Sequence, residues 1–139
     1  MNKHEVKGQQ HFSPPAVELG PHSDRIEVGQ YGEQLAARYL TEAGYIILDR
    51  NWRCRSGEID LVAQQGRMTV ICEVRTRRGH RAGSGLESVT RRKLRRLQRL
   101  ASQWQIQNRN GGNSLRIDVL GIQIHADNTS TIHHVRGAV

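Results

Sequence analysis

Two acidic residues stand in segments that otherwise have the composition of buried β-strands. Asp60 follows Glu58 and Ile59, and Glu73 interrupts the apolar run from Met68 to Val74. A charged carboxylate in such a run is costly unless it is paired or bound to a metal. Because side chains alternate across a strand, a hairpin of these two segments can place both acids side by side.

Two adjacent carboxylates suit Mg²⁺, with Mn²⁺ as the alternative ion. Hard cations take oxygen ligands, and Mg²⁺ keeps open positions for water and phosphate. The backbone carbonyl of Val74 could supply a further oxygen. Such an ion can orient water, lower its pKa and stabilise the charge of an in-line phosphoryl displacement. Arg75 shares a strand face with Glu73, so we expect its guanidinium to face the scissile phosphate.

A purely structural role stays open for each acid taken alone. Asp60 could end a turn, and Glu73 could pair with Arg75 or with an arginine of a helix. Both acids together, on a basic chain, favour the metal site. Glu33 is a third candidate acid, at the margin of the apolar stripe of a predicted helix. It could reach the same end of the sheet or remain a solvated helix residue.

Positive charge is concentrated in one region of the chain. The 139 residues include 21 Lys and Arg against 13 Asp and Glu, a formal net charge of +8. Such a field attracts polyanions, and nucleic acid is the commonest of them. Aromatic residues are only 4% of the chain, which favours duplex or branched DNA over single strands. The residues expected to bind the DNA backbone are Arg77, Arg78, Arg91, Arg92, Lys93, Arg95, Arg96 and Arg99.

The spacing of apolar residues predicts the elements that position these groups. In chain order they are a helix at 27–43, strands at 45–48, 59–63 and 68–76, a helix at 86–107, and strands at 115–124 and 131–135. A hairpin loop at 64–67 and a basic, glycine-rich loop at 77–85 separate some of them. This order predicts one α/β domain at 25–139, in which helices pack against a mixed sheet.

The first 24 residues have no periodic apolar face and contain Pro14, Pro15 and Pro21. We predict that residues 1–24 form a flexible extension. No segment has the composition of a secretion signal or a membrane span, so no membrane partner is expected. Cys54 and Cys72 are therefore expected to be reduced thiols in the cytoplasm.

Several motifs together resemble a known family. They are Gly29–Leu40, Gly44–Leu48, Asn51–Arg53, Gly57–Ala63 and Glu73–Arg77. The chain resembles the YraN-like family of uncharacterised bacterial proteins over about residues 27–135. That family is similar to archaeal Holliday-junction resolvases and belongs with the PD-(D/E)XK, restriction-endonuclease-like superfamily.

The resemblance implies a three-layer restriction-endonuclease-like fold, dependence on Mg²⁺ and action on DNA. By motif, Asp60 matches the metal-binding Asp, Glu73 the acid of the Glu-x-Lys element, and Glu33 the acid of the first helix. Position 75 departs from the family pattern, since it is Arg where the family usually has Lys. Arg75 could clamp a phosphate or stabilise transition-state charge, but it cannot readily serve as a base. Junction resolvases act in pairs, which makes a homodimer plausible.

The sequence thus predicts a Mg²⁺-dependent, structure-selective DNA endonuclease, a hydrolase of phosphodiester bonds. Its predicted catalytic residues are Glu33, Asp60, Glu73 and Arg75. Arg75 favours an alternative, a non-catalytic DNA-binding module of the same fold. A third interpretation is a scaffold that recruits recombination or uptake proteins through its extension. Metal-dependent cleavage would separate the first hypothesis from the other two.

Overall fold

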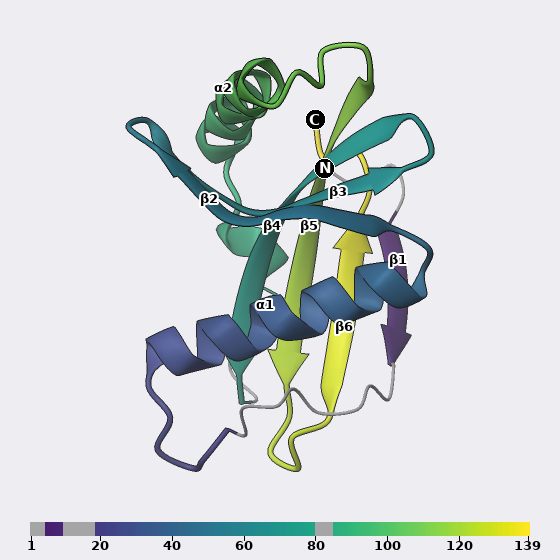
Figure 1. Ribbon diagram of the computed structural model, residues 1–139. Coiled ribbons are helices and arrows are strands. Elements are labelled where there is room, and N and C mark those ends of the chain that lie inside the picture. The colour runs from purple at the N-terminus through teal and green to yellow at the C-terminus, as the bar shows by residue number, and fades with distance from the viewer. Residues whose placement is uncertain (1–4, 10–18, 80–84) are drawn as a thin grey trace.

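The computed structural model describes residues 5–9, 19–79 and 85–139. Two α-helices, one short 3₁₀ helix and six strands make up this part of the chain (Figure 1). In chain order they are β1 (Glu5–Gln9), α1 (Arg25–Glu42), β2 (Ile46–Cys54), β3 (Gly57–Gln65), β4 (Met68–Arg78), η1 (Leu86–Ser88), α2 (Arg91–Gln107), β5 (Ser114–Ile124) and β6 (Ser130–Val135).

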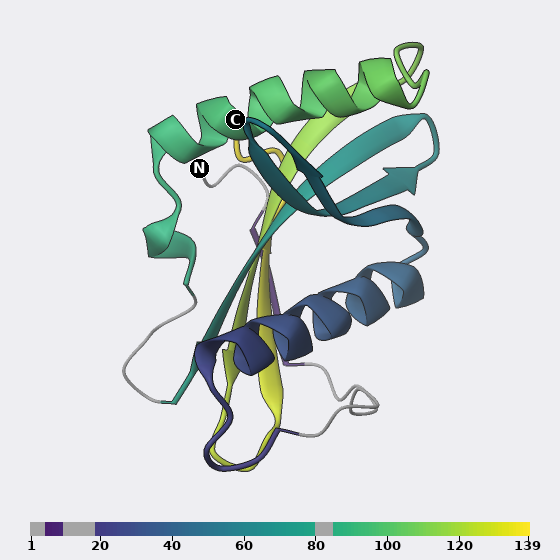
Figure 2. The same ribbon diagram turned by 60° about the vertical axis from the view of Figure 1, so that its left-hand side comes forward.

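The strands form one mixed sheet in the order β1-β6-β5-β4-β3-β2. β4 and β5 are parallel, and the other neighbouring pairs are antiparallel. A parallel pair needs a crossover, and α2 lies between β4 and β5 in the chain. Figure 2 shows α1 and α2 on opposite sides of the twisted sheet. The domain therefore has the three-layer, restriction-endonuclease-like α/β architecture that the sequence predicted.

Each helix buries one apolar face against its own side of the sheet. Leu40 of α1 lies in a cluster with Leu61 and Leu120, and Leu97 of α2 lies in a second cluster with Ile71. A fully buried Leu or Ile side chain contributes about 1.5–3 kcal/mol, so these two clusters hold the layers together. Neither helix, among the residues described, has both the length and the apolar composition needed to cross a bilayer.

The second helix begins later than predicted. The sequence analysis expected one helix at 86–107, but Leu86–Ser88 is a separate 3₁₀ turn and Val89 is extended. Thr90 caps α2, because its side chain accepts a hydrogen bond of 3.2 Å from the backbone N–H of Lys93. A capped terminus fixes where a helix starts, and the apolar pattern alone does not distinguish it from the preceding turn.

Two further boundaries differ from the sequence analysis. Arg77 and Arg78 continue β4 instead of starting a loop, because they pair with the end of β5. Residues 80–84 of that predicted loop lie outside the described residues. Within the predicted extension, Glu5–Gln9 forms a strand that the sequence analysis did not anticipate, and it pairs with β6. The flexibility of residues 1–24 as a whole stays a prediction.

A chain of buried polar groups crosses the α1 side of the sheet. The Tyr39 hydroxyl lies 2.8 Å from Nδ1 of His134, whose Nε2 lies 2.7 Å from Oδ2 of Asp118. Arg116 donates to both Asp118 oxygens, at 2.8 and 3.0 Å. Burial alone would raise the pKa of Asp118, but the hydrogen bonds from His134 and Arg116 hold it below its usual value. The network joins α1, β5 and β6 and satisfies groups that burial would otherwise penalise.

Gly32 lets α1 approach the sheet closely. A Cβ atom at this position would lie 1.8 Å from Oγ1 and 2.8 Å from Cβ of Thr76 in β4. Such distances are far inside van der Waals contact, so only glycine fits here without a shift of the helix. The next residue, Glu33, is therefore held close to the sheet by this contact.

We expect Gly32→Ala to lower the free energy of unfolding by about 1–3 kcal/mol, because the added methyl group overpacks the contact with Thr76. Adding Thr76→Ala should recover part of the loss. Gly29→Ala is the matched control on the same helix, since no atom lies within 4 Å of a Cβ at that position. Urea denaturation followed by circular dichroism measures all four chains. Equal stability of the two single variants would contradict the close approach.

Candidate functional site

β3 and β4 separate at Asp60. The ladder between these strands ends at the pair Leu61 and Cys72, while β3 remains paired with β2 as far as Gly57. Asp60 is the residue just beyond this end. Its Oδ2 accepts a hydrogen bond of 2.8 Å from the backbone N–H of Val74. A side chain thus takes the place of a ladder hydrogen bond and fixes the carboxylate in the fork between the strands.

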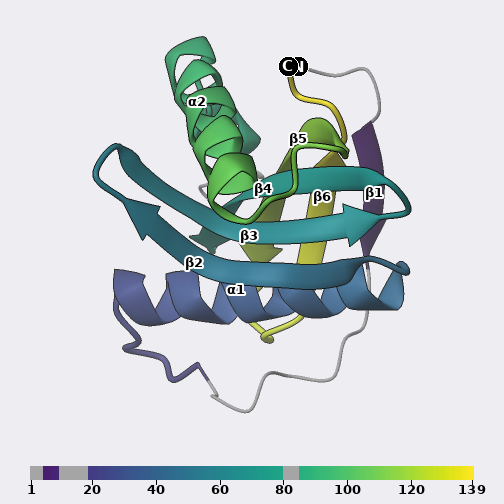
Figure 3. The same ribbon diagram turned by 45° about the horizontal axis from the view of Figure 1, so that its top comes forward.

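The fork changes the side of the sheet on which Ile59 lies. Strict alternation would place Ile59 with Leu61 and Ala63, opposite Val62. Instead, Ile59 and Val62 both lie in the cluster beneath α2, whereas Leu61 and Ala63 lie in the cluster beneath α1. The strand changes its facing at Asp60, where it leaves β4 and turns toward α2. Figure 3 shows the β2–β3 hairpin passing between the two helices.

Glu73 lies on the side of β4 that faces α2. Its side chain is 7% exposed, and its Oε1 lies 2.7 Å from Nζ of Lys93 and 3.3 Å from Nε of Arg75. Two cations from different elements therefore neutralise one buried carboxylate. The sequence analysis assigned Lys93 to DNA binding alone and missed this contact. The sequence does single out Lys93, because it is the only lysine after Lys7 in a chain whose other cations there are arginines.

Burial is the largest cause of the raised pKa of both carboxyls. Burial first, and then the charge of Glu73, raises the pKa of Asp60 to about 8. Burial raises the pKa of Glu73 to about 7, although the charge of Arg75 opposes the shift. Among the described residues, no Lys or Arg side chain forms an ion pair with Asp60. Asp60 thus lacks a cationic partner in this part of the chain, whereas Glu73 has two.

Glu33 approaches the fork from α1. It lines a hollow of about 370 Å³ together with Asn51 and Arg50 of β2. Burial raises the pKa of Glu33, while a hydrogen bond from the Asn51 side chain lowers it. Glu33 in turn raises the pKa of Asp60, so the two carboxyls are close enough to interact. Asn51 has a φ of 51°, which Asn tolerates better than most residues, and the sequence analysis assigned it no role.

A divalent cation would find two carboxylate ligands here. In the described part of the chain, no three His, Cys, Asp or Glu side chains come close enough together to hold a metal. Asp60 and Glu73 nevertheless fit such an ion, since both are buried and burial raises the pKa of both carboxyls. The oxygen-only donor set is the kind that Mg²⁺ prefers.

The arginines of α2 form an exposed face. Leu94, Leu97 and Leu100 point into the core, while the arginines between them are exposed and Lys93 is half-buried. A hollow of about 270 Å³ on this face is lined by Thr90, Arg92, Lys93, Arg96 and Arg99. Since Lys93 and Arg96 also act on Glu73, the hollow borders the carboxylate pair.

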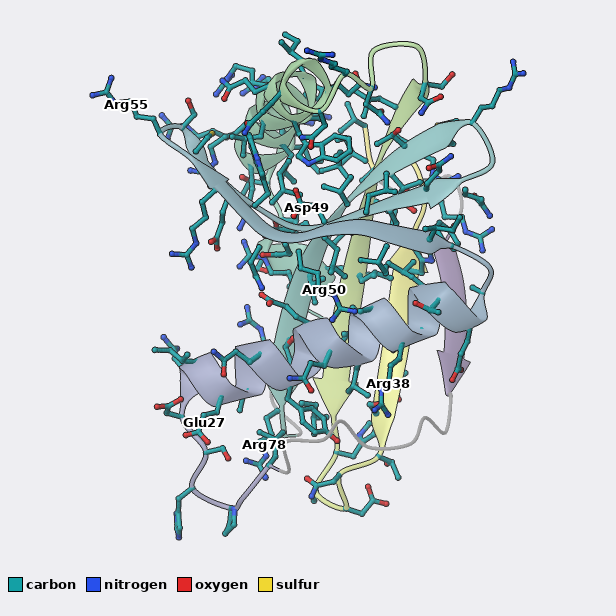
Figure 4. The ribbon with its side chains drawn as sticks, in the orientation of Figure 1. Glu27, Arg38, Asp49, Arg50, Arg55 and Arg78 are labelled. Carbon is teal, nitrogen blue, oxygen red and sulfur yellow. The ribbon has the colours of Figure 1, made fainter. Side chains whose placement is uncertain are left out.

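Two predicted DNA contacts lie apart from this face. Nη1 of Arg78 donates a hydrogen bond of 2.8 Å to the carbonyl of Gly20, before α1. Figure 4 shows Arg78 below α1, at the end of β4 away from α2. Arg77 precedes it on the same strand and approaches Gly85. Both extend β4 beyond the fork, and a role for either in DNA binding stays a prediction.

The fork, the buried acids and the flanking helices define a domain of the restriction-endonuclease-like class. Within that class, this chain belongs to the uncharacterised protein family UPF0102, whose family model matches residues 32–122. The matched segment includes all four residues predicted to be catalytic. The resemblance to the YraN-like family is thereby confirmed.

Relatives from several bacteria resemble the chain over most of its length. A UPF0102 protein of Kineococcus radiotolerans is 52% identical over 112 residues, which is 79% of this chain and 91% of that protein. One from Acidothermus cellulolyticus is 45% identical over 129 residues, 86% of this chain and 98% of that protein. One from Frankia casuarinae is 46% identical over 111 residues, 80% of this chain and 94% of that protein.

Replacing Asp60 should change how stability depends on pH. Between the unfolded pKa of about 4 and the folded pKa of about 8, the folded protein keeps a proton that the unfolded chain has lost. The free energy of unfolding of the wild type therefore falls as pH rises through this window. Asp60→Asn keeps an acceptor for Val74 but cannot ionise. In chelator, it should gain on the order of 2 kcal/mol relative to the wild type between pH 5 and 8.

Asp127→Asn provides the control for this measurement. Hydrogen bonds from Thr129 lower the pKa of Asp127, so its protonation changes below the window. Its stability difference from the wild type should stay flat between pH 5 and 8. If the difference in free energy of unfolding between Asp60→Asn and the wild type, measured by urea denaturation, also stays constant over this range, the pKa of Asp60 is not raised in the folded protein.

Proposed function

We propose that this protein is a Mg²⁺-dependent endonuclease that hydrolyses phosphodiester bonds in duplex or branched DNA. The observation that carries the proposal is the buried pair of Asp60 and Glu73, which lies at a fork in the sheet and beside an arginine-covered helix. Buried acids with raised pKa values are a common property of catalytic and metal sites. Their position next to a cationic face brings them near a bound polyanion.

Each residue of the proposed site would have a separate role. Asp60 and Glu73 would hold Mg²⁺ or Mn²⁺, which when bound can orient water and offset charge on the phosphate. Arg75 would hold a phosphate oxygen, for which a guanidinium is well suited. Glu33, fixed by Gly32 and by its hydrogen bond from Asn51, would position water on the α1 side of the fork.

The α2 face would hold the DNA backbone. Its exposed cations are Arg91, Arg92, Arg95, Arg96 and Arg99, with Lys93 at the inner edge. Phosphate contacts of this kind position a protein without reading sequence. The similarity of the family to junction resolvases supports branched DNA as the substrate, and a homodimer is proposed on the same analogy. The free thiols of Cys54 and Cys72 support the cytoplasm as the location.

A non-catalytic DNA-binding module is the second candidate. Arg75 favours it, because an arginine at this position cannot readily take up a proton from water. The same metal site and the same α2 face would then serve binding alone. A scaffolding role for the extension is the third candidate, and residues 1–4 and 10–18 of that extension lie outside the described residues.

Incubation with labelled DNA tests the proposed cleavage. Single strands, duplexes and four-way junctions would be compared in Mg²⁺, in Mn²⁺ and in chelator. We expect cuts only with a metal ion, and loss of cutting in Asp60→Asn. This variant preserves the acceptor for the Val74 amide and so separates the loss of charge from the loss of fold. Cutting that survives both chelator and Asp60→Asn would exclude this site.

Arg75→Lys distinguishes the first two candidates. If the wild type binds DNA without cutting it and Arg75→Lys cuts, the protein is a binding module on a nuclease fold. If the wild type cuts, Arg75 is sufficient at that position. Native gels of these reactions measure DNA binding, and denaturing gels of the same reactions measure cleavage.

Removing charge from α2 should weaken DNA binding and flatten its dependence on salt. Each phosphate contact contributes about −0.9 to the slope of log K against log salt. The pair Arg92→Gln and Arg95→Gln should therefore reduce the slope by nearly 2. The pair Arg25→Gln and Arg67→Gln removes the same charge from exposed sites outside α2, at the start of α1 and in the β3–β4 turn, and should change the slope far less. Equal slopes for the two double variants, measured by fluorescence anisotropy, would reject α2 as the DNA-binding face.

A further inference from the structure

A lysine at position 93 is unusual in this arginine-rich chain. The lysines among its 21 basic residues are Lys3, Lys7 and Lys93, and every basic residue after Lys7 except Lys93 is arginine. This one lysine contacts Oε1 of Glu73 through Nζ at 2.7 Å. An ammonium group is a compact point charge that can approach one carboxylate oxygen directly, whereas a guanidinium is a broad, planar fork.

Arg75 is packed against its neighbours at its base, although 28% of its side chain is exposed, against 21% for Lys93. Its Nε is buried and has no hydrogen-bond partner among the described residues, although it lies 3.3 Å from Glu73. Gly85 packs against its base, since a Cβ on Gly85 would lie 3.0 Å from Cβ of Arg75. Gly85 also has a φ of 83°, so other residues are disfavoured there. Gly85 therefore restricts the Arg75 side chain on one side.

Lys93 borders an open cationic hollow. The same side chain that contacts Glu73 also lines the 270 Å³ hollow on α2. The other residues that line the hollow are Thr90, Arg92, Arg96 and Arg99, none of which is acidic. Such a lining attracts an anion with the size and charge of a phosphate. Lys93 therefore stands between the carboxylate pair and a place for a phosphate.

We propose that Lys93 is a second phosphate-contacting cation of the site, beside Arg75. While no metal ion is bound, its ammonium neutralises Glu73. When a divalent ion takes that carboxylate, the ammonium turns to a phosphodiester oxygen in the hollow. α2 thus supplies the lysine that strand position 75 lacks. This inference rests on the proposed metal site, and it makes the contribution of Lys93 to DNA binding depend on the metal ion.

The dependence on metal gives the proposal a test that needs no cleavage. DNA affinity would be measured by fluorescence anisotropy at matched ionic strength, in EDTA and in Ca²⁺, with gels to confirm that the DNA stays intact. For Lys93→Met, the ratio of its Kd to the wild-type Kd should be near one in EDTA, because Lys93 is then held by Glu73. In Ca²⁺ the ratio should rise to about ten, as expected for a lost charge-assisted contact.

Arg92→Met is the matched control, since it lines the same hollow but does not contact Glu73. Its Kd ratio should be raised equally in both conditions. Lys93→Arg keeps the charge and should restore part of the affinity in Ca²⁺. If circular dichroism shows that Lys93→Met fails to fold, Lys93→Gln takes its place. An equal ratio in EDTA and Ca²⁺, or a ratio near one in both, would overturn the proposal.

Calorimetry of Ca²⁺ and Mg²⁺ binding separates this proposal from the proposed function. If the wild type binds neither ion, the metal site fails, and the role of Lys93 fails with it. If the wild type binds an ion and Asp60→Asn does not, the metal site stands. A metal-independent Kd ratio for Lys93→Met would then contradict the role of Lys93 alone.

Discussion

Burying two carboxylates side by side is the constraint around which this domain is arranged. A buried charge costs several kcal/mol unless it is compensated, and Asp60 and Glu73 share one region of low exposure. The compensation within the protein is partial: a backbone amide for Asp60, and Lys93 with Arg75 for Glu73. In spite of these contacts, burial raises the pKa values of Asp60 and Glu73 to about 8 and 7. A bound cation would stabilise the ionised form of both buried carboxylates.

The rest of the fold can be understood as holding that pair in place. The strands part at Asp60, and the Asp60 carboxylate accepts the hydrogen bond from the Val74 amide that a strand carbonyl would otherwise accept. Gly32 brings α1 and Glu33 down onto the sheet from one side. From the other side, Thr90 starts α2 at the point where Lys93 can reach Glu73. The exposed arginines of the same helix then place positive charge beside the acids, which connects the proposed metal site to the proposed surface for DNA.

Much of this arrangement was predictable from the sequence, because apolar periodicity and charged residues within strands are strong local signals. They predicted the order of the main elements, the two buried helix stripes and the proximity of Asp60 to Glu73. The break before α2 and the changed facing of Ile59 were missed, since both depend on a cap or a fork that periodicity does not encode. The contact of Lys93 with Glu73 was missed for a related reason, as it joins two elements whose relative position only the packed domain defines.

A crystal of the protein grown with Mn²⁺ would test the central claim most directly, through the anomalous scattering of the ion. The account predicts one strong anomalous peak in contact with carboxylate oxygens of both Asp60 and Glu73, with Nζ of Lys93 moved away from Glu73. Val74 would stay hydrogen-bonded to Asp60, since that contact builds the fork. A crystal at saturating Mn²⁺ with no peak at these residues, and with the contact between Lys93 and Glu73 intact, would contradict the account.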